Sequence, residues 1–167
     1  MLRENEVVEL TPGLTLPTQT RVRYGETDQM GVVYHGKYIE YMELGRTDFM
    51  RAIGYTYRRM EDEGHFFVVV EMNAKLHAPA RYDDLITVWT SVTKLRPSSL
   101  VFSYELRLDD DDRNSASNGE GPAERDGVVL ATGSTRLASL NAATRKVQPI
   151  PEVFAQMIRR CLPQATS

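Results

Sequence analysis

The sequence predicts an α+β domain in which an antiparallel sheet of five or more strands is wrapped around one long helix. Three observations lead to this fold class. A short alternating strand comes first, a single long helical pattern follows it, and four extended segments then come one after another.

The first strand is expected at residues 21–24, where apolar and basic side chains alternate, and it stops in a turn-rich loop around residues 25–31. Asp28 lies inside this loop. Seven residues later, His35 and Gly36 lead into the helical pattern. The unpaired N–H groups at a helix N-terminus can bind a developing negative charge, while a nearby carboxylate attacks or activates water. From the residues alone, the simpler interpretation is that Asp28 caps a turn or the start of the helix.

The helix is expected over residues 37–53. Its apolar residues recur at spacings of three and four, which gives a stripe wide enough to be covered over much of the helix circumference. Gly54 is well placed as the C-terminal stop. We therefore expect one largely buried helix.

The four later strands differ in their patterns. Residues 66–78 begin as a continuous apolar run and continue at period two, and residues 85–93 are rich in β-branched side chains. Residues 100–108 alternate between apolar and mixed positions, and residues 128–140 look extended again. Near the C-terminus, residues 152–162 fit a short amphipathic helix with five apolar side chains on one face: Val153, Phe154, Met157, Ile158 and Leu162.

The chain is expected to divide into three parts. Residues 1–18 form a loosely held N-terminal arm, residues 19–150 the main domain, and residues 151–167 a short helix and tail. Within the domain, residues 109–127 form a flexible, acidic insertion loop. The clustered Asp residues there lack the spacing of a calcium-binding loop, so we expect no metal. Two histidines flank the second strand and are too far apart in sequence for a local ligand pair, so both are expected to be structural: His65 and His77.

Composition excludes several classes of protein. A chain of 167 residues suits one domain, and 41% hydrophobic with 26% charged residues is ordinary for a soluble globular protein. The net charge of −3 gives no reason to expect nucleic acid binding, and no apolar run is long enough to span a bilayer. The acidic N-terminus does not suit a secretion signal, and Cys161 is the only cysteine. A cytoplasmic location is therefore expected.

The loop Glu26-Thr-Asp-Gln-Met-Gly-Val-Val-Tyr-His-Gly-Lys-Tyr38 resembles the signature of the hotdog-fold acyl-CoA thioesterases of the 4-hydroxybenzoyl-CoA thioesterase type. Two further segments, 80–88 and 94–102, resemble that family's entry into its third strand and its hairpin. The resemblance extends over roughly residues 19–150 in the right order. Glu26 stands where the family commonly has Asp, and Gln29-Met30 replace its more usual small residues.

This resemblance implies an enzyme that hydrolyses an acyl-CoA to a carboxylic acid and coenzyme A, with no cofactor beyond its substrate. Asp28 would be the nucleophile or the general base, and backbone N–H groups around His35 and Gly36 would bind the oxyanion. Two alternatives stay open: a thioesterase acting on acyl groups of a carrier protein, and a non-catalytic subunit that binds acyl ligands.

Other residues acquire roles through the same resemblance. The His35 side chain could assist catalysis, although its backbone N–H is expected to matter more. Tyr34 and Tyr38 are expected to shape the acyl pocket. Glu43 is a candidate because some hotdog thioesterases take their carboxylate from this helix, and the alternative is an ion pair with Arg46.

Phosphate recognition and oligomeric state follow in the same way. Lys94 and Arg96 match the family's phosphate-contacting hairpin, with Arg58 and Arg59 as alternatives. Family members are dimers or tetramers with active sites between subunits, and a sheet around one helix leaves edges that self-pairing would cover. We therefore expect a homo-oligomer in which Asp28 faces residues of a second chain.

Overall fold

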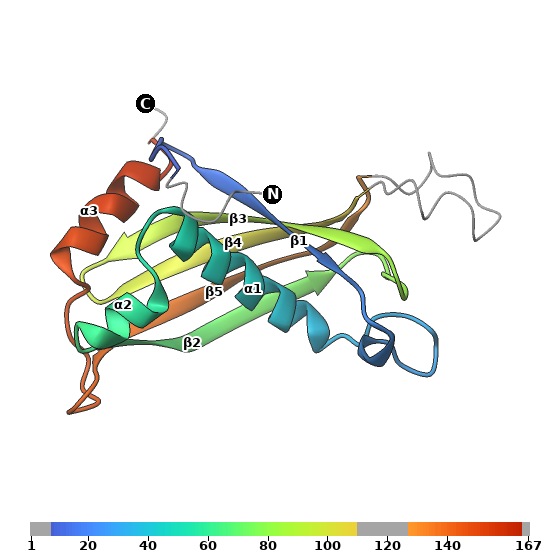
Figure 1. The fold of residues 1–167 in the computed structure, drawn as a ribbon, viewed down its shortest axis with the longest axis horizontal. Coiled ribbons are helices and arrows are strands. Elements are labelled where there is room, and N and C mark those ends of the chain that lie inside the picture. Colours follow the sequence, from blue (N-terminus) through green and yellow to red (C-terminus); the bar gives the residue numbers. More distant parts are fainter. Residues whose placement is uncertain (1–7, 110–126, 165–167) are drawn as a thin grey trace.

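The computed structural model describes residues 8–109 and 127–164 of the chain. One antiparallel sheet curls around the long helix α1 (Lys37–Ala52), with the strand order β1-β3-β4-β5-β2 (Figure 1). The strands are β1 (Thr15–Arg21), β2 (His65–Leu76), β3 (Leu85–Arg96), β4 (Ser99–Leu108) and β5 (Val129–Asn141). This arrangement confirms the predicted α+β class and the hotdog architecture that the family resemblance implies.

Helix α1 begins and ends close to where its sequence pattern predicts. The chain leaves the helix through Gly54, whose φ of 82° is the left-handed conformation that glycine adopts without steric cost. The helix approaches the sheet most closely at Gly45, where a Cβ atom would lie 2.4 Å from Thr90 Oγ1 and 2.8 Å from Val88 Cγ1. A residue without a side chain therefore allows the backbone of α1 to lie directly against β3.

The concave face of the sheet forms the core against α1. In β4 the predicted alternation is confirmed, because Leu100, Phe102, Leu106 and their same-face neighbours are buried while the residues between them are only half-buried. Phe49 of α1 packs edge-on against the ring of Phe102, with centroids 5.7 Å apart.

The strand before the loop lies earlier than predicted. The sequence pattern indicated residues 21–24, whereas β1 ends at Arg21 and residues Tyr24–Glu26 form a short 3-10 helix, η1. Pro17 lies within β1, which is tolerated because β1 is an edge strand whose only partner among the described strands is β3. This strand crosses the boundary that we expect between an arm (1–18) and the domain, and the division into domains stays a prediction.

Two short helices complete the described fold. Helix α2 (Tyr57–Asp62) was not predicted; the Thr56 side chain caps it by accepting a hydrogen bond from the backbone N–H of Arg59. Helix α3 (Glu152–Cys161) confirms the predicted C-terminal helix and packs into the main core through Phe154 and Ile158. Its predicted apolar face was wrong at Val153, which is 58% exposed, because the buried face turns toward Ala155 and Cys161 instead.

The expected insertion loop at 109–127 falls almost wholly on residues 110–126, which lie outside the described part of the chain. Within residues 8–109 and 127–164, no helix is long and apolar enough to cross a membrane. Over the same residues, no three His, Cys, Asp or Glu side chains are grouped so that they could hold a metal ion.

Strand β2 leaves apolar surface uncovered. It is the last strand of the sheet and pairs only with β5 among the described strands. Met72 lies opposite Thr135 and Leu76 opposite Ala131, and since these two partners are buried on the helix side of the sheet, Met72 and Leu76 point to that side too. Both are more than 40% exposed, because α1 does not extend over this part of β2.

Candidate active site at the start of the central helix

The loop that carries Asp28 is a compact hairpin. Thr27 and Val33 form a β-bridge, the Asp28 N–H donates to the Val32 carbonyl at 2.9 Å, and the Gly31 N–H donates to the Asp28 carbonyl at 3.0 Å. Gly31 has a φ of 74°, so the tight turn falls at a residue that adopts this conformation readily. Asp28 is therefore held by backbone bonds on a well-defined turn.

The Asp28 carboxylate is half-buried and partly engaged. Its Oδ1 accepts a hydrogen bond from the Met30 N–H at 2.8 Å, which is the turn-capping role that the residues alone left open. Within the described residues, no donor is bonded to Oδ2. One carboxylate oxygen thus fixes the side chain and the other is available to react.

The start of α1 offers two unpaired donors. The N–H groups of Lys37 and Tyr38 donate to the carbonyls of Tyr34 and His35, at 2.8 and 3.4 Å. The N–H groups of His35 and Gly36 have no acceptor among the described residues. Unpaired donors at the positive end of a helix dipole are able to bind a negatively charged oxygen.

The two tyrosines at this helix end differ in exposure. The Tyr34 side chain is 49% exposed and its ring lies 4.2 Å from the ring of His35, which is also exposed. The Tyr34 ring also covers Gly36, where a Cβ atom would lie 2.9 Å from it. Tyr38 is buried, and burial raises the pKa of its hydroxyl, which accepts a hydrogen bond from the Ala80 N–H at 3.2 Å. Tyr38 therefore supports the loop framework, and Tyr34 lies at the surface beside the two open donors.

A second loop, residues 80–84, forms backbone hydrogen bonds with the Asp28 hairpin. The Ala80 carbonyl accepts from the Val33 N–H at 2.8 Å, and Val32 forms a β-bridge with Arg81. The buried Asp84 accepts from the Arg81 N–H through its side chain, at 2.8 Å. The Asp28 hairpin is thus fixed against β3 as well as against α1.

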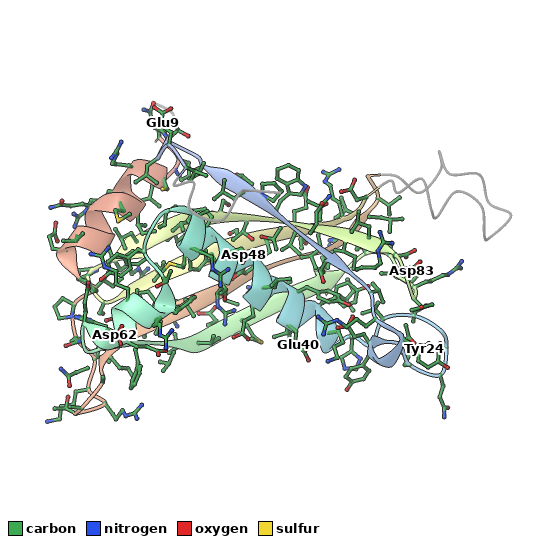
Figure 2. All side chains as sticks on the ribbon, viewed as in Figure 1. Glu9, Tyr24, Glu40, Asp48, Asp62 and Asp83 are labelled. Carbon is green, nitrogen blue, oxygen red and sulfur yellow. The ribbon has the colours of Figure 1, made fainter. Side chains whose placement is uncertain are left out.

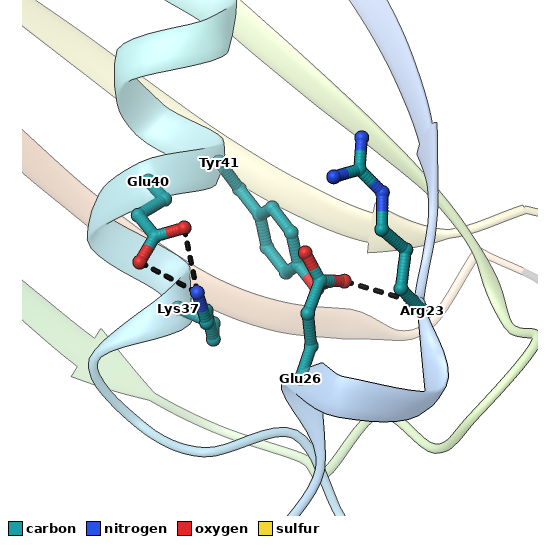
Figure 3. Close-up of polar contacts among 5 residues, drawn as sticks. All are labelled: Arg23, Glu26, Lys37, Glu40 and Tyr41. Atoms are coloured by element: carbon teal, nitrogen blue, oxygen red, sulfur yellow. Dashed lines mark hydrogen bonds and ion pairs between the residues drawn. The ribbon is translucent and has the colours of Figure 1, made fainter.

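The contact between Glu26 and Tyr41 was not predicted from the sequence. The Glu26 carboxylate accepts hydrogen bonds from the Arg23 N–H at 2.8 Å and from the Tyr41 hydroxyl at 2.9 Å (Figure 3). The only sequence signal was the spacing of Tyr38 and Tyr41, which puts both on one face of α1. Figure 3 also shows the neighbouring ion pair, in which Lys37 Nζ contacts both Glu40 oxygens at 2.8 Å.

Glu43 has the alternative partner that we considered for it. Its exposed carboxylate lies 3.5 Å from Nη2 of the buried Arg46, one turn along the helix. Because the Glu43 carboxylate is exposed to solvent, the attraction between the two charges is worth little to stability.

The structure does not bring Lys94 and Arg96 to Asp28 within one chain. The loop end of the molecule carries Tyr24 and Asp83, whereas Asp62 and the hairpin between β3 and β4 lie at the other end (Figure 2). Lys94 is nine residues along β3 from Leu85, which at about 3.3 Å per residue corresponds to about 30 Å.

Lys94 and Arg96 do line a surface depression of about 400 Å³ on the convex face. Arg136 adds a third cation to it, with Nε 3.0 Å from the Glu71 carboxylate. The lining residues come from four neighbouring strands: Glu71, Lys94, Arg96, Ser99, Leu100, Val101, Ser134 and Arg136.

The remaining candidates have structural partners or lie at the surface. Arg59 pairs with Glu63 at 2.9 Å and lies over the Tyr55 ring at 4.5 Å, and Arg58 is exposed. The two histidines have local hydrogen-bond partners: His65 Nδ1 lies 2.7 Å from Gln148 Nε2, and His77 Nε2 lies 2.9 Å from Thr132 Oγ1.

Comparisons with known proteins show similarity to thioesterases. A family profile described as thioesterase superfamily matches residues 30–114. The acyl-CoA thioester hydrolase YbgC of Escherichia coli is 38% identical over 86 residues, which is 52% of this chain and 64% of that protein. The matched segment therefore spans less than two thirds of that relative's own length.

Two solved structures extend the similarity over most of the chain. The Thermus thermophilus protein TT1821 is 35% identical with a TM-score of 0.72, covering 87% of this chain and 96% of its own. The DHNA-CoA thioesterase of Staphylococcus aureus is 27% identical with a TM-score of 0.73, covering 87% of each chain.

Proposed function

Because this chain belongs to the thioesterase superfamily, we propose that it hydrolyses the thioester of an acyl-CoA to a carboxylic acid and coenzyme A. The observation that carries the proposal is the pairing of one free Asp28 oxygen with two unbonded N–H groups, of His35 and Gly36, within the described residues. Thioester hydrolysis needs these two elements, a nucleophile or base and a donor set for the carbonyl oxygen. The relatives' names point to the same reaction class.

Two routes use these groups. In the first, Asp28 attacks the acyl carbon, the tetrahedral oxyanion accepts hydrogen bonds from the His35 and Gly36 N–H groups, and its collapse expels the coenzyme A thiolate to leave a mixed anhydride that water hydrolyses. In the second, Asp28 takes a proton from water as the water attacks the same carbon, and collapse of the tetrahedral oxyanion expels the coenzyme A thiolate, which takes up that proton. One oxyanion donor is worth on the order of 100- to 1,000-fold in rate. Neither route uses a metal or a redox cofactor.

A second copy of the chain completes the proposed site. The uncovered helix-side surface of β2, with Met72 and Leu76, favours self-pairing along this edge. Antiparallel pairing of two β2 strands would bring the hairpin end of one sheet alongside the loop end of the other. Lys94 and Arg96 of one chain would then bind the phosphates of a substrate whose thioester lies at Asp28 of the other chain. A dimer or a larger even assembly in the cytoplasm is part of this proposal.

A thiol-release assay on a panel of acyl-CoAs tests the proposal. Wild type is expected to release coenzyme A from at least one substrate, and Asp28→Asn is expected to be at least about 100-fold slower, since the amide is a poor nucleophile and base. The amide oxygen still accepts from the Met30 N–H, so the loop is expected to keep its shape. Asp62→Asn, an exposed carboxylate at the other end of the molecule, is the matched control.

Each other outcome has a distinct meaning. Equal release by wild type and Asp28→Asn would remove Asp28 from the mechanism. Release from an acyl carrier protein but from no acyl-CoA would favour the carrier-protein alternative. Binding of acyl-CoA without release from any thioester would favour the non-catalytic alternative.

A further inference from the structure

Glu26 is bonded to both ends of the Asp28 hairpin. Its backbone carbonyl accepts from the Tyr34 N–H at 2.9 Å, and its backbone N–H donates to the Arg23 carbonyl at 3.0 Å. Its carboxylate accepts a hydrogen bond from the Arg23 N–H at 2.8 Å. The residue therefore joins the chain entering the hairpin to the chain leaving it for α1.

The same carboxylate reaches the helix itself. Glu26 Oε2 accepts from the Tyr41 hydroxyl at 2.9 Å, and Tyr41 is 3% exposed on the second turn of α1 (Figure 3). Burial and the Glu26 carboxylate raise the pKa of Tyr41, so its hydroxyl remains a donor at neutral pH. A buried hydroxyl that donates to a charged acceptor makes one of the stronger side-chain hydrogen bonds in a protein.

The contact has a counterpart on the other side of the hairpin. Tyr38, whose ring centroid lies 6.1 Å from that of Tyr41, accepts from the Ala80 N–H, and Ala80 in turn binds the Val33 N–H. Two tyrosines on successive turns thus hold the hairpin from two directions. The Tyr41 side acts directly on the segment that carries Asp28.

We infer that Glu26 and Tyr41 are positioning residues, which set the Asp28 carboxylate against the open N–H groups of His35 and Gly36. The inference rests on the proposed thioester hydrolysis, to which it adds two residues that touch no substrate. Their contribution is geometric: a reacting group displaced by about 1 Å can cost about 100-fold in rate. Without the Tyr41 hydroxyl, the hairpin keeps its own backbone hydrogen bonds but loses the side-chain hydrogen bond between Glu26 and α1.

Four variants separate geometry from chemistry. Tyr41→Phe removes only the hydroxyl and is expected to lower kcat about tenfold with KM within about twofold of wild type. Glu26→Ala removes the carboxylate bonds to both Arg23 and Tyr41 and is expected to lower kcat about 100-fold. Glu26→Gln keeps an oxygen acceptor and is expected to retain kcat within about threefold. Glu40→Gln, which breaks the exposed ion pair with Lys37 on the same turn of the helix, is the control and is expected to match wild type.

A double variant tests whether the two residues act through one contact. Glu26→Ala combined with Tyr41→Phe is expected to be no slower than Glu26→Ala alone, because the second change removes a bond that is already lost. Multiplied losses would overturn the inference, and so would a Tyr41→Phe enzyme with the kcat of wild type. A Glu26→Gln enzyme as slow as Glu26→Ala would also overturn it, because the charge and not the geometry would then matter.

Amide hydrogen exchange gives a readout that needs no activity. In Tyr41→Phe, the Asp28 and Tyr34 amides, which donate to Val32 and Glu26, are expected to exchange at least about tenfold faster, with the amides of β4 unchanged. Unchanged exchange at both loop amides would overturn the inference even if every variant were slow. If wild type releases no thiol from any substrate, the proposed function fails on its own, and the exchange data still decide whether Tyr41 holds the hairpin.

Discussion

The loop end of the molecule and the unpaired edge of β2 differ in how many of their contacts come from the same chain. At the loop end, one chain supplies the partners: Glu26, Tyr34 and Ala80 exchange backbone and side-chain hydrogen bonds with the Asp28 hairpin and with α1. Along β2, among the described residues, one chain supplies partners on one side only, and Met72 and Leu76 remain exposed. The groups of the proposed site thus come from one chain, whereas the proposal assigns its enclosure to a second chain.

The largest effect on self-association and activity is expected from a substitution in β2, the unpaired edge strand of the described sheet. Met72→Lys places a charge on the apolar helix-side surface of β2 and is expected to weaken self-association at least about 100-fold, with a parallel loss of thiol release. Analytical ultracentrifugation over a concentration series measures the first and the thiol-release assay the second.

The neighbouring position sharpens this test. Asn73→Lys adds the same charge to the opposite face of the same strand, where Asn73 donates to Ser134 at 2.7 Å. Its self-association is expected to be unchanged. If Asn73→Lys dissociates the protein and Met72→Lys does not, the copies associate through the convex face of the sheet and not through the helix-side surface of β2.

At the loop end, Gly36→Ala is expected to lower kcat about tenfold. The added Cβ would lie 2.9 Å from the Tyr34 ring, so either the ring or the helix start has to shift. Replacing Tyr34 by Leu in the same chain removes the close contact and is expected to restore most of the lost rate. A Gly36→Ala enzyme with full kcat would show that the helix start tolerates displacement.

Helix α1 connects the two regions, and its contact with β3 contains a buried hydroxyl, Thr90 Oγ1, without a hydrogen-bond partner among the described residues. Thr90→Val replaces it with a methyl group of similar shape and is expected to raise the free energy of unfolding by about 1 kcal/mol. Urea denaturation measures the change. Thr135→Val is the matched control, because the Thr135 hydroxyl is bonded to Tyr104 at 2.7 Å; it is expected to lower stability by about the same amount.

The smallest effect is expected just before β2, at Glu63. Hydrogen bonds from Tyr55 and Arg59 lower the pKa of this carboxyl below its usual value. A lowered pKa in the folded state gives stability that is fully present above the unfolded pKa, near 4.3, and is lost as the pH falls through the folded value.

Wild type is therefore expected to exceed Glu63→Gln in urea midpoint at pH 7, with the difference shrinking as the pH falls below the unfolded pKa. Glu61→Gln, which changes an exposed carboxylate in the adjoining helix α2, is the matched control. A Glu63→Gln difference that persists unchanged at pH 3 would mean that packing and not charge is responsible.

The sequence predicted the elements whose pattern is long and regular. Helix α1 and strands β2 to β5 follow from periodicity, and Gly54 marks the end of the helix as expected. The first strand was misplaced because residues 1–18, which contain Pro17, were expected to form a loosely held arm, although a proline is acceptable in a strand that lies at an edge. Helix α2 was missed because six residues are too few for a periodic signal.

The candidate site was predictable where residues are close in sequence. The Asp28 loop and the start of α1 lie on one continuous segment, so their proximity follows from local structure. The bond between Glu26 and Tyr41 joins the second turn of a helix to a loop and depends on the direction of two side chains, which the spacing of residues does not give. The distance of Lys94 from Asp28 depends on which end of β3 lies beside the Asp28 loop. The register between β1 and β3 shows that it is the Leu85 end, and the spacing of residues in the sequence does not give this register.

Pro17 has a consequence for assembly. The sheet ends on one side in β1, whose proline has no N–H with which to recruit another strand, and on the other side in β2. Two copies joined through β2 would carry these proline-bearing strands at both outer rims, where the missing N–H makes pairing with a further strand less favourable.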